Sequence, residues 1–272
     1  MSYLAFKYHP MRPKSKRFTV SRRNQILQRL HENGQVLVND LSREFHVSEV
    51  TIRNDLEQLE QKQALIRARG GAIRMEGNVS FDPRIADKDR LHYAEKAAIG
   101  KKAAQLIKER DTVILDSGTT TAEIVKNLSH INELTIITNA LNIVNQLVSF
   151  SKFNVIVPGG YLRNTALSLI GPLAEKNLKG FCVDKVFVGV DGLDTRAGAY
   201  TPNLDEAHLN EIMIEISQEV ILVADSSKFN KKSLAFICPL GTIDTVITDS
   251  MASGEDIKRM EDAGIRVLVA DN

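Results

Sequence analysis

A run of small, mostly hydroxyl-bearing residues follows one of the apolar segments of this chain. The run consists of Asp116, Ser117, Gly118, Thr119, Thr120 and Thr121. It leads from Val113–Leu115 into a segment whose apolar residues have helical spacing. Small residues allow backbone N–H groups and hydroxyls to approach an anion at the positive end of a helix. A lone Ser-Gly-Thr more often only caps a helix, but between a strand and a helix this run predicts a phosphate cradle.

Polar or flexible residues also follow three other apolar segments. They are Thr138 with Asn139, Gly159 with Gly160, and Asp191 with Gly192. If the segments are parallel strands, their carboxyl ends meet at one edge of a sheet, where α/β proteins bind ligands. Each residue alone could be surface decoration. Together they predict one cleft shared with the phosphate cradle.

A second set of side chains is suited to reading nucleic acid. In the segment SEVTIRNDLEQLEQ, which starts at Ser48, the side chains of Arg53 and Asn54 fall on the outward face of the expected helix. Arginine bonds guanine and asparagine bonds adenine in a bidentate manner in the major groove. Ser48 and the helix N-terminus can hold a backbone phosphate. This segment therefore predicts a DNA-reading helix.

Three helices and a hairpin must position these side chains. Residues 21–33 have helical spacing and end at Gly34, and Leu41 and Phe45 lie four apart in the next segment. In the third segment the apolar residues fall on one stripe, which consists of Ile52, Leu56 and Leu59. Two short helices joined by a tight turn, the second exposing arginine and asparagine, predict a helix-turn-helix.

The segment ALIRARGGAIRM alternates apolar and basic residues around Gly70 and Gly71. It predicts a two-stranded wing that carries Arg67, Arg69 and Arg74. A single arginine here is most simply a solvated surface charge, but the joint pattern favours DNA binding. The candidate DNA contacts are Ser48, Glu49, Thr51, Arg53, Asn54, Arg67 and Arg69.

The charge of the chain is unevenly distributed. Residues 1–80 carry 14 Lys and Arg against 8 Asp and Glu, a net +6, whereas the rest of the chain carries −5. Local positive potential favours a polyanionic partner for the first part only. The alternative is a solvated basic leader, because six cations lie close together: Arg12, Lys14, Lys16, Arg17, Arg22 and Arg23.

The second part of the chain alternates short β-rich apolar runs with helical patterns. The runs are 113–115, 135–137, 155–157, 186–190, 220–223, 246–247 and 267–269. This predicts an α/β fold with a mainly parallel, buried sheet. A polar segment without sustained periodicity precedes it. The expected organisation is a basic flexible arm over 1–17, a winged helix-turn-helix over 18–75, a linker over 76–95 and an effector domain over 96–272.

Composition excludes several classes of protein. The chain of 272 residues is 43% hydrophobic and 25% charged, as in ordinary globular proteins. Its two cysteines cannot form a disulfide framework, and neither a membrane span nor a signal peptide is visible, so a cytoplasmic protein is expected. No dinucleotide or Walker motif follows any strand, and the six histidines lack metal spacing. No metal or cofactor is expected.

VSEVTIRNDLEQLEQ in the third helix and RARGGA in the wing resemble the DeoR family of bacterial transcriptional regulators. The resemblance covers nearly the whole chain. It implies an N-terminal winged helix-turn-helix and a C-terminal sensor domain similar to phosphosugar isomerases. The family usually has arginine where Asn54 stands and histidine where Arg69 stands. The resemblance therefore does not determine which operator base the residue at position 54 prefers. ILDSGTTT and DSSKFN look most like the branch that represses N-acetylgalactosamine and galactitol catabolism.

The resemblance also implies a phosphorylated sugar as effector, with Glu206 and Lys228 added to the site. Lys228 would then give phosphate a point charge, while Asp191 or Glu206 would accept bonds from sugar hydroxyls. The expected function is a repressor, a dimer or tetramer, that releases operator DNA when the sugar binds. Two alternatives stay open: a phosphosugar isomerase or aldolase-like enzyme, and an architectural DNA-binding protein whose second domain ignores ligands.

Overall fold

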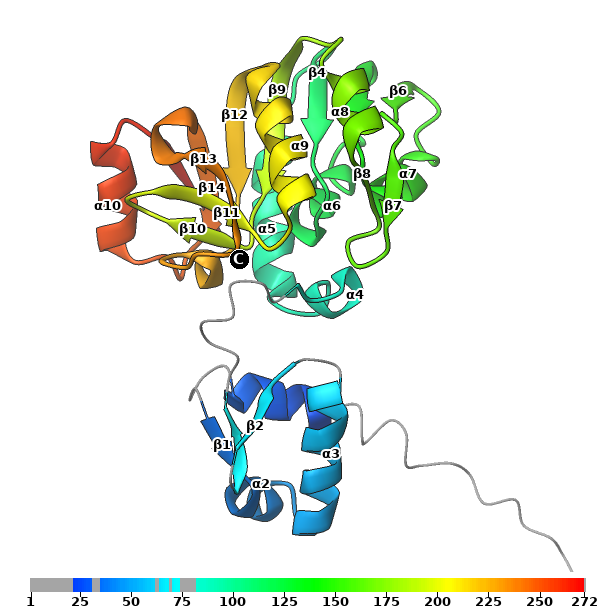
Figure 1. Cartoon of the computed structure of the whole chain (residues 1–272). Coiled ribbons are helices and arrows are strands. Elements are labelled where there is room, and N and C mark those ends of the chain that lie inside the picture. The colour runs from blue at the N-terminus through cyan, green and yellow to red at the C-terminus, as the bar shows by residue number, and fades with distance from the viewer. Residues whose placement is uncertain (1–21, 31–34, 62–63, 69, 74–81, 272) are drawn as a thin grey trace, which may run out of the picture. The chain divides into compact units, whose positions relative to one another are not determined.

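The computed structural model describes residues 22–30, 35–61, 64–68, 70–73 and 82–271 (Figure 1). Contacts divide the chain into two compact units, Met1–Asn78 and Val79–Asn272. The basic arm expected over residues 1–17 lies outside the described residues, and so do Gly34, Arg69 and Arg74.

The first unit is a winged helix-turn-helix, as the sequence predicts. After a helix over residues 22–30 come β1 (Gln35–Leu37), α2 (Val38–Glu44), α3 (Glu49–Gln61), β2 (Ile66–Ala68) and β3 (Gly71–Ile73). The strands form an antiparallel sheet in the order β1-β3-β2. The wing hairpin is thus confirmed, while β1 adds a third strand that the sequence analysis did not anticipate.

The apolar stripe of α3 forms the centre of this unit. Ile52 and Leu56 have 0% of their surface exposed and Leu59 has 3%, and they pack with Ile26 and Leu30 of the first helix. Burying one such side chain stabilises a fold by about 1.5 to 3 kcal/mol. The buried stripe holds α3 to the unit and leaves its opposite face exposed.

Two glycines permit the tight wing. Gly70 has a φ of +84°, a left-handed conformation that side chains other than glycine rarely adopt. A Cβ on Gly71 would lie 2.0 Å from the carbonyl oxygen of Val36 in β1. The absence of side chains at both positions therefore lets the hairpin turn and lets β1 approach β3.

The second unit is an α/β domain with one large sheet and two small ones. Its helices are α4 (Ile85–Lys88), α5 (Tyr93–Ala104), α6 (Thr119–Val125), α7 (Leu141–Leu147), α8 (Pro172–Leu178), α9 (Leu204–Glu215), α10 (Gly254–Asp262) and the 3-10 turns η1 (Ser226–Lys228) and η2 (Leu240–Thr242). The large sheet contains β4 (Thr112–Leu115), β5 (Leu134–Ile137), β6 (Phe153–Ile156), β9 (Val183–Gly189), β12 (Ser217–Val223), β14 (Thr245–Asp249) and β15 (Arg266–Ala270). The small sheets contain β7 (Tyr161–Arg163) with β8 (Ser168–Ile170), and β10 (Gly192–Asp194), β11 (Gly198–Thr201) and β13 (Ala235–Pro239).

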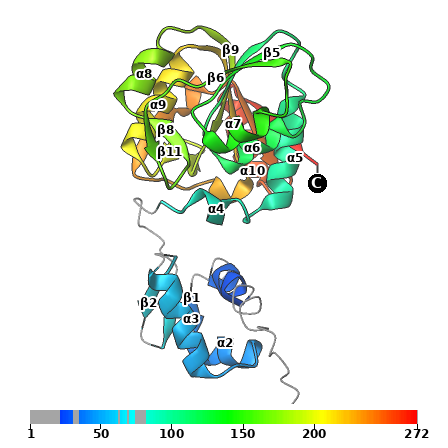
Figure 2. The ribbon, with the colours of Figure 1, turned by 90° about the vertical axis from the view of Figure 1, so that its right-hand side faces the viewer.

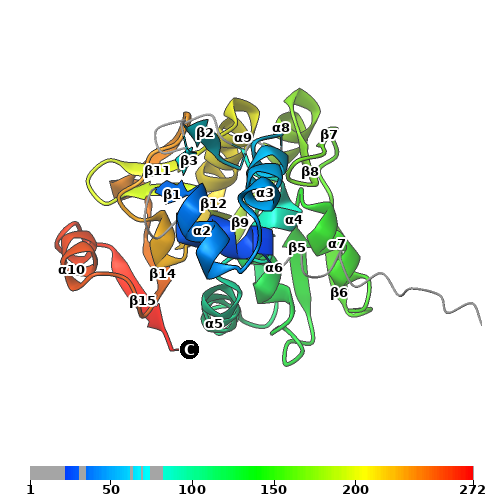
Figure 3. The ribbon, with the colours of Figure 1, turned by 90° about the horizontal axis from the view of Figure 1, so that it is seen from below.

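All seven strands of the large sheet are parallel, in the order β15-β14-β12-β9-β4-β5-β6. Figure 3 shows most of them side by side in this order. Each corresponds to one of the seven apolar runs, so the predicted parallel sheet is confirmed. The short antiparallel strands of the small sheets were not predicted.

Both faces of the large sheet are covered by helices. Figures 1 and 2 show α8 and α9 against one face and α5, α6 and α7 against the other. In β4, Ile114 packs into the core on the α9 side, whereas Val113 and Leu115 pack into the core on the α5 side. A strand with apolar neighbours on both faces requires a continuous apolar run. In the part of the chain that the structure describes, no helix is long and apolar enough to cross a membrane.

The predicted linker over residues 76–95 differs from the structure in its second half. Residues 76–81 lie outside the described residues, but from Asp82 onward the chain is built into the second unit. α4 and the first turn of α5 fall within the predicted linker. The segment is polar because it carries charged groups that pair with the domain, and polarity alone suggested a connector.

The strand order reverses at the centre of the large sheet. From β4 the chain moves outward through β5 and β6, and from β9 it moves through β12, β14 and β15 in the other direction. β4 and β9 are neighbours, with Leu115 paired to Phe187. Ligands of open α/β sheets bind in the crevice beyond the carboxyl ends of two such strands. The fold therefore places Asp116 and Asp191 on the two sides of one crevice.

Candidate functional sites

The exposed face of α3 carries the predicted DNA contacts. The Ser48 hydroxyl accepts a hydrogen bond from the backbone N–H of Thr51 at 3.2 Å, which caps the helix. Arg53 and Asn54 are exposed, and Val50 beside them is 62% exposed. The helix N-terminus and a face of mixed chemistry are thus both presented to solvent, as a recognition helix requires.

Arg53 and Arg67 connect this helix to the wing. Arg53 Nη2 lies 2.5 Å from a carboxylate oxygen of Glu49, one turn earlier. Arg67 Nη1 donates to the backbone carbonyl of Arg53 at 3.1 Å, and its own backbone N–H donates to Glu60. The structure therefore brings together six of the seven predicted DNA contacts, whereas Arg69 lies outside the described residues: Ser48, Glu49, Thr51, Arg53, Asn54 and Arg67.

Two of the basic residues counted in the N-terminal charge excess have a structural partner. Arg22 and Arg23 place their Nε atoms 2.6 and 2.7 Å from the two carboxylate oxygens of Asp55. Asp55 lies on α3 and is 2% exposed. The pairing holds the first helix to α3, so these two arginines are not part of a solvated leader. Their charge is also compensated rather than available in full to a polyanion.

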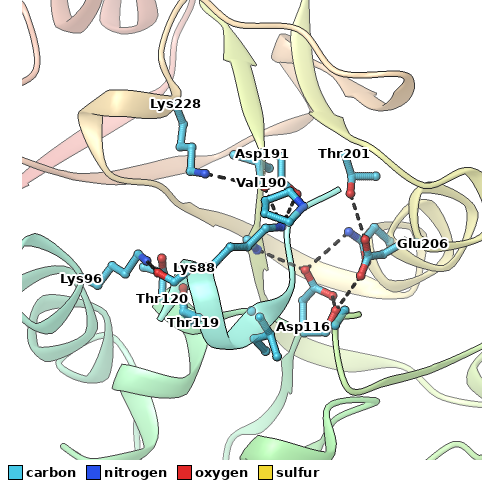
Figure 4. A pocket seen from close by; sticks show the side chains of 17 residues that line it. Lys88, Lys96, Asp116, Thr119, Thr120, Val190, Asp191, Thr201, Glu206 and Lys228 are labelled. Carbon is cyan, nitrogen blue, oxygen red and sulfur yellow. Dashed lines mark hydrogen bonds and ion pairs between the residues drawn. The ribbon is translucent and has the colours of Figure 1, made fainter. Parts of the chain in front are cut away.

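A pocket lies at the crevice where the strand order reverses (Figure 4). Its walls come from the loops after β4 and β9, from α9 and from the segment around α4 and α5. Eight of the twelve predicted ligand-binding residues line it, namely Asp116, Ser117, Gly118, Thr119, Thr120, Asp191, Glu206 and Lys228. The structure thus brings together residues that lie more than 100 positions apart in sequence.

One side of the pocket is acidic. Glu206 accepts hydrogen bonds from Ser117 and Thr201, each at 3.0 Å, and from Arg163 at 3.1 Å. Asp116 accepts one from the backbone N–H of Gly189 at 3.2 Å. Burial raises the pKa of Asp116 well above its usual range, and the charge of Glu206 adds to the rise. Burial also raises the pKa of Glu206 against the opposing charge of Arg163. A raised pKa favours the protonated carboxyl, which can both donate a hydrogen bond to a hydroxyl group and accept one from it.

The other side of the pocket holds three lysines. Lys88 Nζ lies 2.8 Å from Asp191, and Lys228 Nζ lies 3.6 Å from it. Burial alone would raise the pKa of Asp191, but Lys88 and Lys228 outweigh that effect and lower it to about 2. Lys96 Nζ donates to the backbone carbonyl of Lys88, and burial lowers the pKa of Lys96 to about 8. Several ammonium groups around one cavity can neutralise a multiply charged anion.

Lys88 and Lys96 were missed by the sequence analysis. Lys96 is only 4% exposed and stands on the buried stripe of α5, three residues before Ile99 and seven before Ala103. A lysine at an apolar position of a helical stripe is a signal that could have identified it. Lys88 had no such signal, because it lies in the polar segment interpreted as a linker.

Four predicted ligand-binding residues do not line the pocket. Thr121 is fully buried and bonds the carbonyl of Gly118. Asn139 is fully buried, and its side-chain amide donates to Leu169. Gly159 and Gly160 follow β6, which lies at one edge of the large sheet. A Cβ on Gly160 would lie 2.5 Å from the Ile170 carbonyl oxygen. Those glycines lie beyond the edge strand of the sheet, whereas the pocket forms at its centre.

Within the described ranges, no group of three or more His, Cys, Asp or Glu side chains is arranged to hold a metal ion. The polar groups that line the pocket include ammonium, hydroxyl and carboxyl groups, which can bind and orient a ligand.

Two family profiles match the chain. Residues 22–77 match the DeoR-like helix-turn-helix domain, and residues 91–250 match the DeoR C-terminal sensor domain. The first range contains α3 and the wing, and the second contains most of the pocket residues. The matches therefore cover α3 with the wing and most of the pocket.

Curated relatives match over nearly their full length. A protein provisionally named as the aga operon transcriptional repressor of Escherichia coli O157:H7 is 40% identical over 92% of this chain and 94% of its own. The transcriptional regulator YulB of Bacillus subtilis is 36% identical over 90% and 95% of the two chains. The transcriptional repressor AccR of Agrobacterium fabrum is 36% identical over 85% and 90%.

Proposed function

The chain belongs to the DeoR family of transcriptional regulators, and from this premise we propose that it represses a sugar-catabolism operon and leaves operator DNA when a phosphorylated sugar binds its second unit. The family membership makes it a regulator of the repressor type and not an enzyme. The proposal adds the effector, the release and the class of operon. A 40% identical relative named for the aga operon supports a catabolic target in the N-acetylgalactosamine and galactitol branch.

The pocket at the strand reversal carries this proposal. Three lysines and the hydroxyls of Thr119 and Thr120 gather at one part of it, and the carboxyls of Asp116 and Glu206, with the Ser117 hydroxyl, at another. A phosphate group fits the first part, since it needs positive charge and several donors. Sugar hydroxyls fit the second, since carboxyl groups can both accept and donate hydrogen bonds. A phosphorylated sugar presents both kinds of group on one small molecule.

On the DNA side, α3 is proposed to enter the major groove. Arg53 and Asn54 would contact base edges, and Ser48 with the helix N-terminus would contact a phosphate. Arg67 and the wing would contact the backbone. One recognition helix reads only a short half-site, so a homo-oligomer, a dimer or tetramer, is part of the proposal.

The test is a titration of the operator complex with sugar phosphates. The operator is first selected from random duplexes, and fluorescence anisotropy then follows its binding while phosphorylated hexoses, ketoses and amino sugars are added. One of them is expected to weaken the complex by about 5- to 150-fold and to raise the melting temperature of the free protein. A sugar phosphate that tightens the complex would contradict ligand-induced release from DNA. If no member of the panel shifts the melting temperature, an architectural DNA-binding protein whose second unit binds no such ligand would be favoured.

The pKa of Lys96 predicts how ligand affinity depends on pH. Above pH 8 the folded protein loses the Lys96 proton, because burial lowers that pKa to about 8. A bound phosphate favours the charged lysine, so affinity for the best sugar phosphate of the panel should fall roughly tenfold between pH 7 and pH 9. The phosphate itself is fully ionised there, with its second pKa at about 6.

Isothermal titration calorimetry across this pH range measures the effect. Lys96→Met should bind the same ligand more weakly at pH 7 and with little change up to pH 9. A flat profile for the wild-type protein would show that Lys96 does not contact the phosphate.

A further inference from the structure

Residues 82–88, called the strap below, lie against the ligand pocket and are held there at both ends. At the first end, Asp82 accepts hydrogen bonds from Arg163 and, at 3.2 Å, from Thr165. The backbone N–H of Ile85 donates to the carbonyl of Thr165 at 2.7 Å. At the other end, Lys88 reaches Asp191 with both carboxylate oxygens within 2.9 Å. The strap is thus docked by specific polar contacts.

The groups that hold the strap are also groups of the pocket. Arg163 binds Asp82 with one guanidinium nitrogen and the pocket residue Glu206 with another. Asp191 lines the pocket, as does Lys96, which bonds the backbone carbonyl of Lys88. Figure 4 shows Lys88 extending from α4 among these side chains. A ligand that engages Asp191, Lys96 or Glu206 therefore acts on an anchor of the strap.

The strap leaves little room for a ligand. The cavity has a volume of about 60 Å³, whereas pockets for small organic ligands usually enclose about 300 to 1,000 Å³. Pro83, Ile85 and Lys88 of the strap form part of its wall. Enclosing a sugar phosphate in this site needs more room than the cavity offers, and the strap is a part of the wall that specific polar contacts hold in place.

The Lys88–Asp191 ion pair is the strap contact that a bound phosphate would change first. In the structure the Lys88 ammonium is neutralised by Asp191, with side chains 22% and 19% exposed. A phosphate placed among Lys88, Lys96 and Lys228 competes with Asp191 for Lys88 and repels the Asp191 carboxylate. Lys228, 3.6 Å away, remains as a partner for Asp191. The exchange of partners therefore leaves no charged group of this set without a partner.

The strap is also where the chain enters the second unit. Residues 74–81 alone separate it in sequence from Ile73, the last residue of the wing strand β3. A change in the position of the strap thus acts on the segment that covalently tethers the DNA-binding unit.

From these contacts we infer that the Lys88–Asp191 pair is a latch: it holds the strap on the empty pocket in the operator-binding state, and an anionic ligand opens it by drawing Lys88 away from Asp191. This inference rests on the proposed function and names the step by which the pocket acts on DNA binding. Lys88 is a positioning residue for the strap as well as a ligand contact.

The latch is tested on the full chain without any ligand. Lys88→Met and Asp191→Asn both remove the pair, and Lys185→Met is the matched control, because Lys185 pairs with Asp111 at 2.7 Å with side chains only 11% and 14% exposed. Hydrogen exchange of the peptide spanning residues 82–92 reports strap docking, and anisotropy reports operator affinity. Both latch variants should exchange faster in this peptide and bind operator about 5- to 150-fold more weakly. The control should match wild type in both measurements.

Inorganic phosphate, compared with chloride at equal ionic strength, should accelerate exchange of the same peptide in the wild-type protein. The latch is overturned if Lys88→Met keeps wild-type operator affinity, if its affinity falls without faster strap exchange, or if phosphate leaves strap exchange unchanged. These results are separable from the proposed function: sugar phosphates that fail to release wild-type protein would refute release, while the ligand-free variants would still decide the latch.

Discussion

Replacement of Arg53 by alanine is expected to weaken binding to the selected operator by about 1 to 3 kcal/mol and to change binding to random duplex far less. The reason is that a bidentate arginine–guanine contact discriminates among bases by about this amount. Arg53 is exposed on α3, and its side chain pairs with Glu49 of the same helix. That exposed pair is worth little and can be exchanged for a base edge.

Anisotropy titrations on operator and random duplexes at several salt concentrations measure this effect. Arg67→Ala should instead weaken both duplexes similarly and reduce the salt slope by about 1, as expected for a phosphate contact. Arg29→Ala is a control in the same unit, because Arg29 bonds Glu44 in an exposed pair. Equal losses on both duplexes for Arg53→Ala would refute base reading by this residue.

Replacement of Glu206 by alanine is expected to lower the free energy of unfolding of the second unit by about 1 to 3 kcal/mol. The loss arises because Arg163, 9% exposed, would keep its charge in a buried site with one of its two carboxylate partners removed. Ser117 and Thr201 would also lose an acceptor. Glu206→Gln keeps an acceptor and should cost less.

Urea unfolding followed by circular dichroism measures the change. Glu133→Ala is the matched control, since Glu133 pairs with Arg110 at 2.9 Å with side chains 64% and 80% exposed, and it should cost about 0.5 kcal/mol or less. A Glu206→Ala protein as stable as this control would show that the buried pair contributes nothing net.

The seven strands of the large sheet could be predicted because each contains a short apolar run, and the central strands are buried on both faces. Val113–Leu115 and Val220–Val223 carry apolar residues at every position. An amphipathic helix or a half-exposed strand would instead place polar residues at regular intervals. The strands of the small sheets were not predicted, since β7 and β10 have only three residues each. Three residues are too few to show a periodic pattern, so these strands are recognised only by the strands with which they pair.

Part of the candidate pocket could be predicted for a related reason. Asp116 and Asp191 follow strands, and the sequence shows that much. The order of the strands cannot be read from the sequence, so the glycines after β6 were assigned to the same site as the residues after β4 and β9. Only the three-dimensional order shows that β6 lies at the edge of the sheet and the pocket at its centre.

The pairing of Asp55 with Arg22 and Arg23 limits how the winged unit can be isolated as a fragment. A fragment that starts after Arg23 would retain all of α3 and the wing, yet it would contain a solitary carboxylate in an apolar interior. Such an isolated anion strongly destabilises a small domain. Fragments made for DNA-binding studies should therefore begin upstream of Arg22, even though no base contact is proposed there.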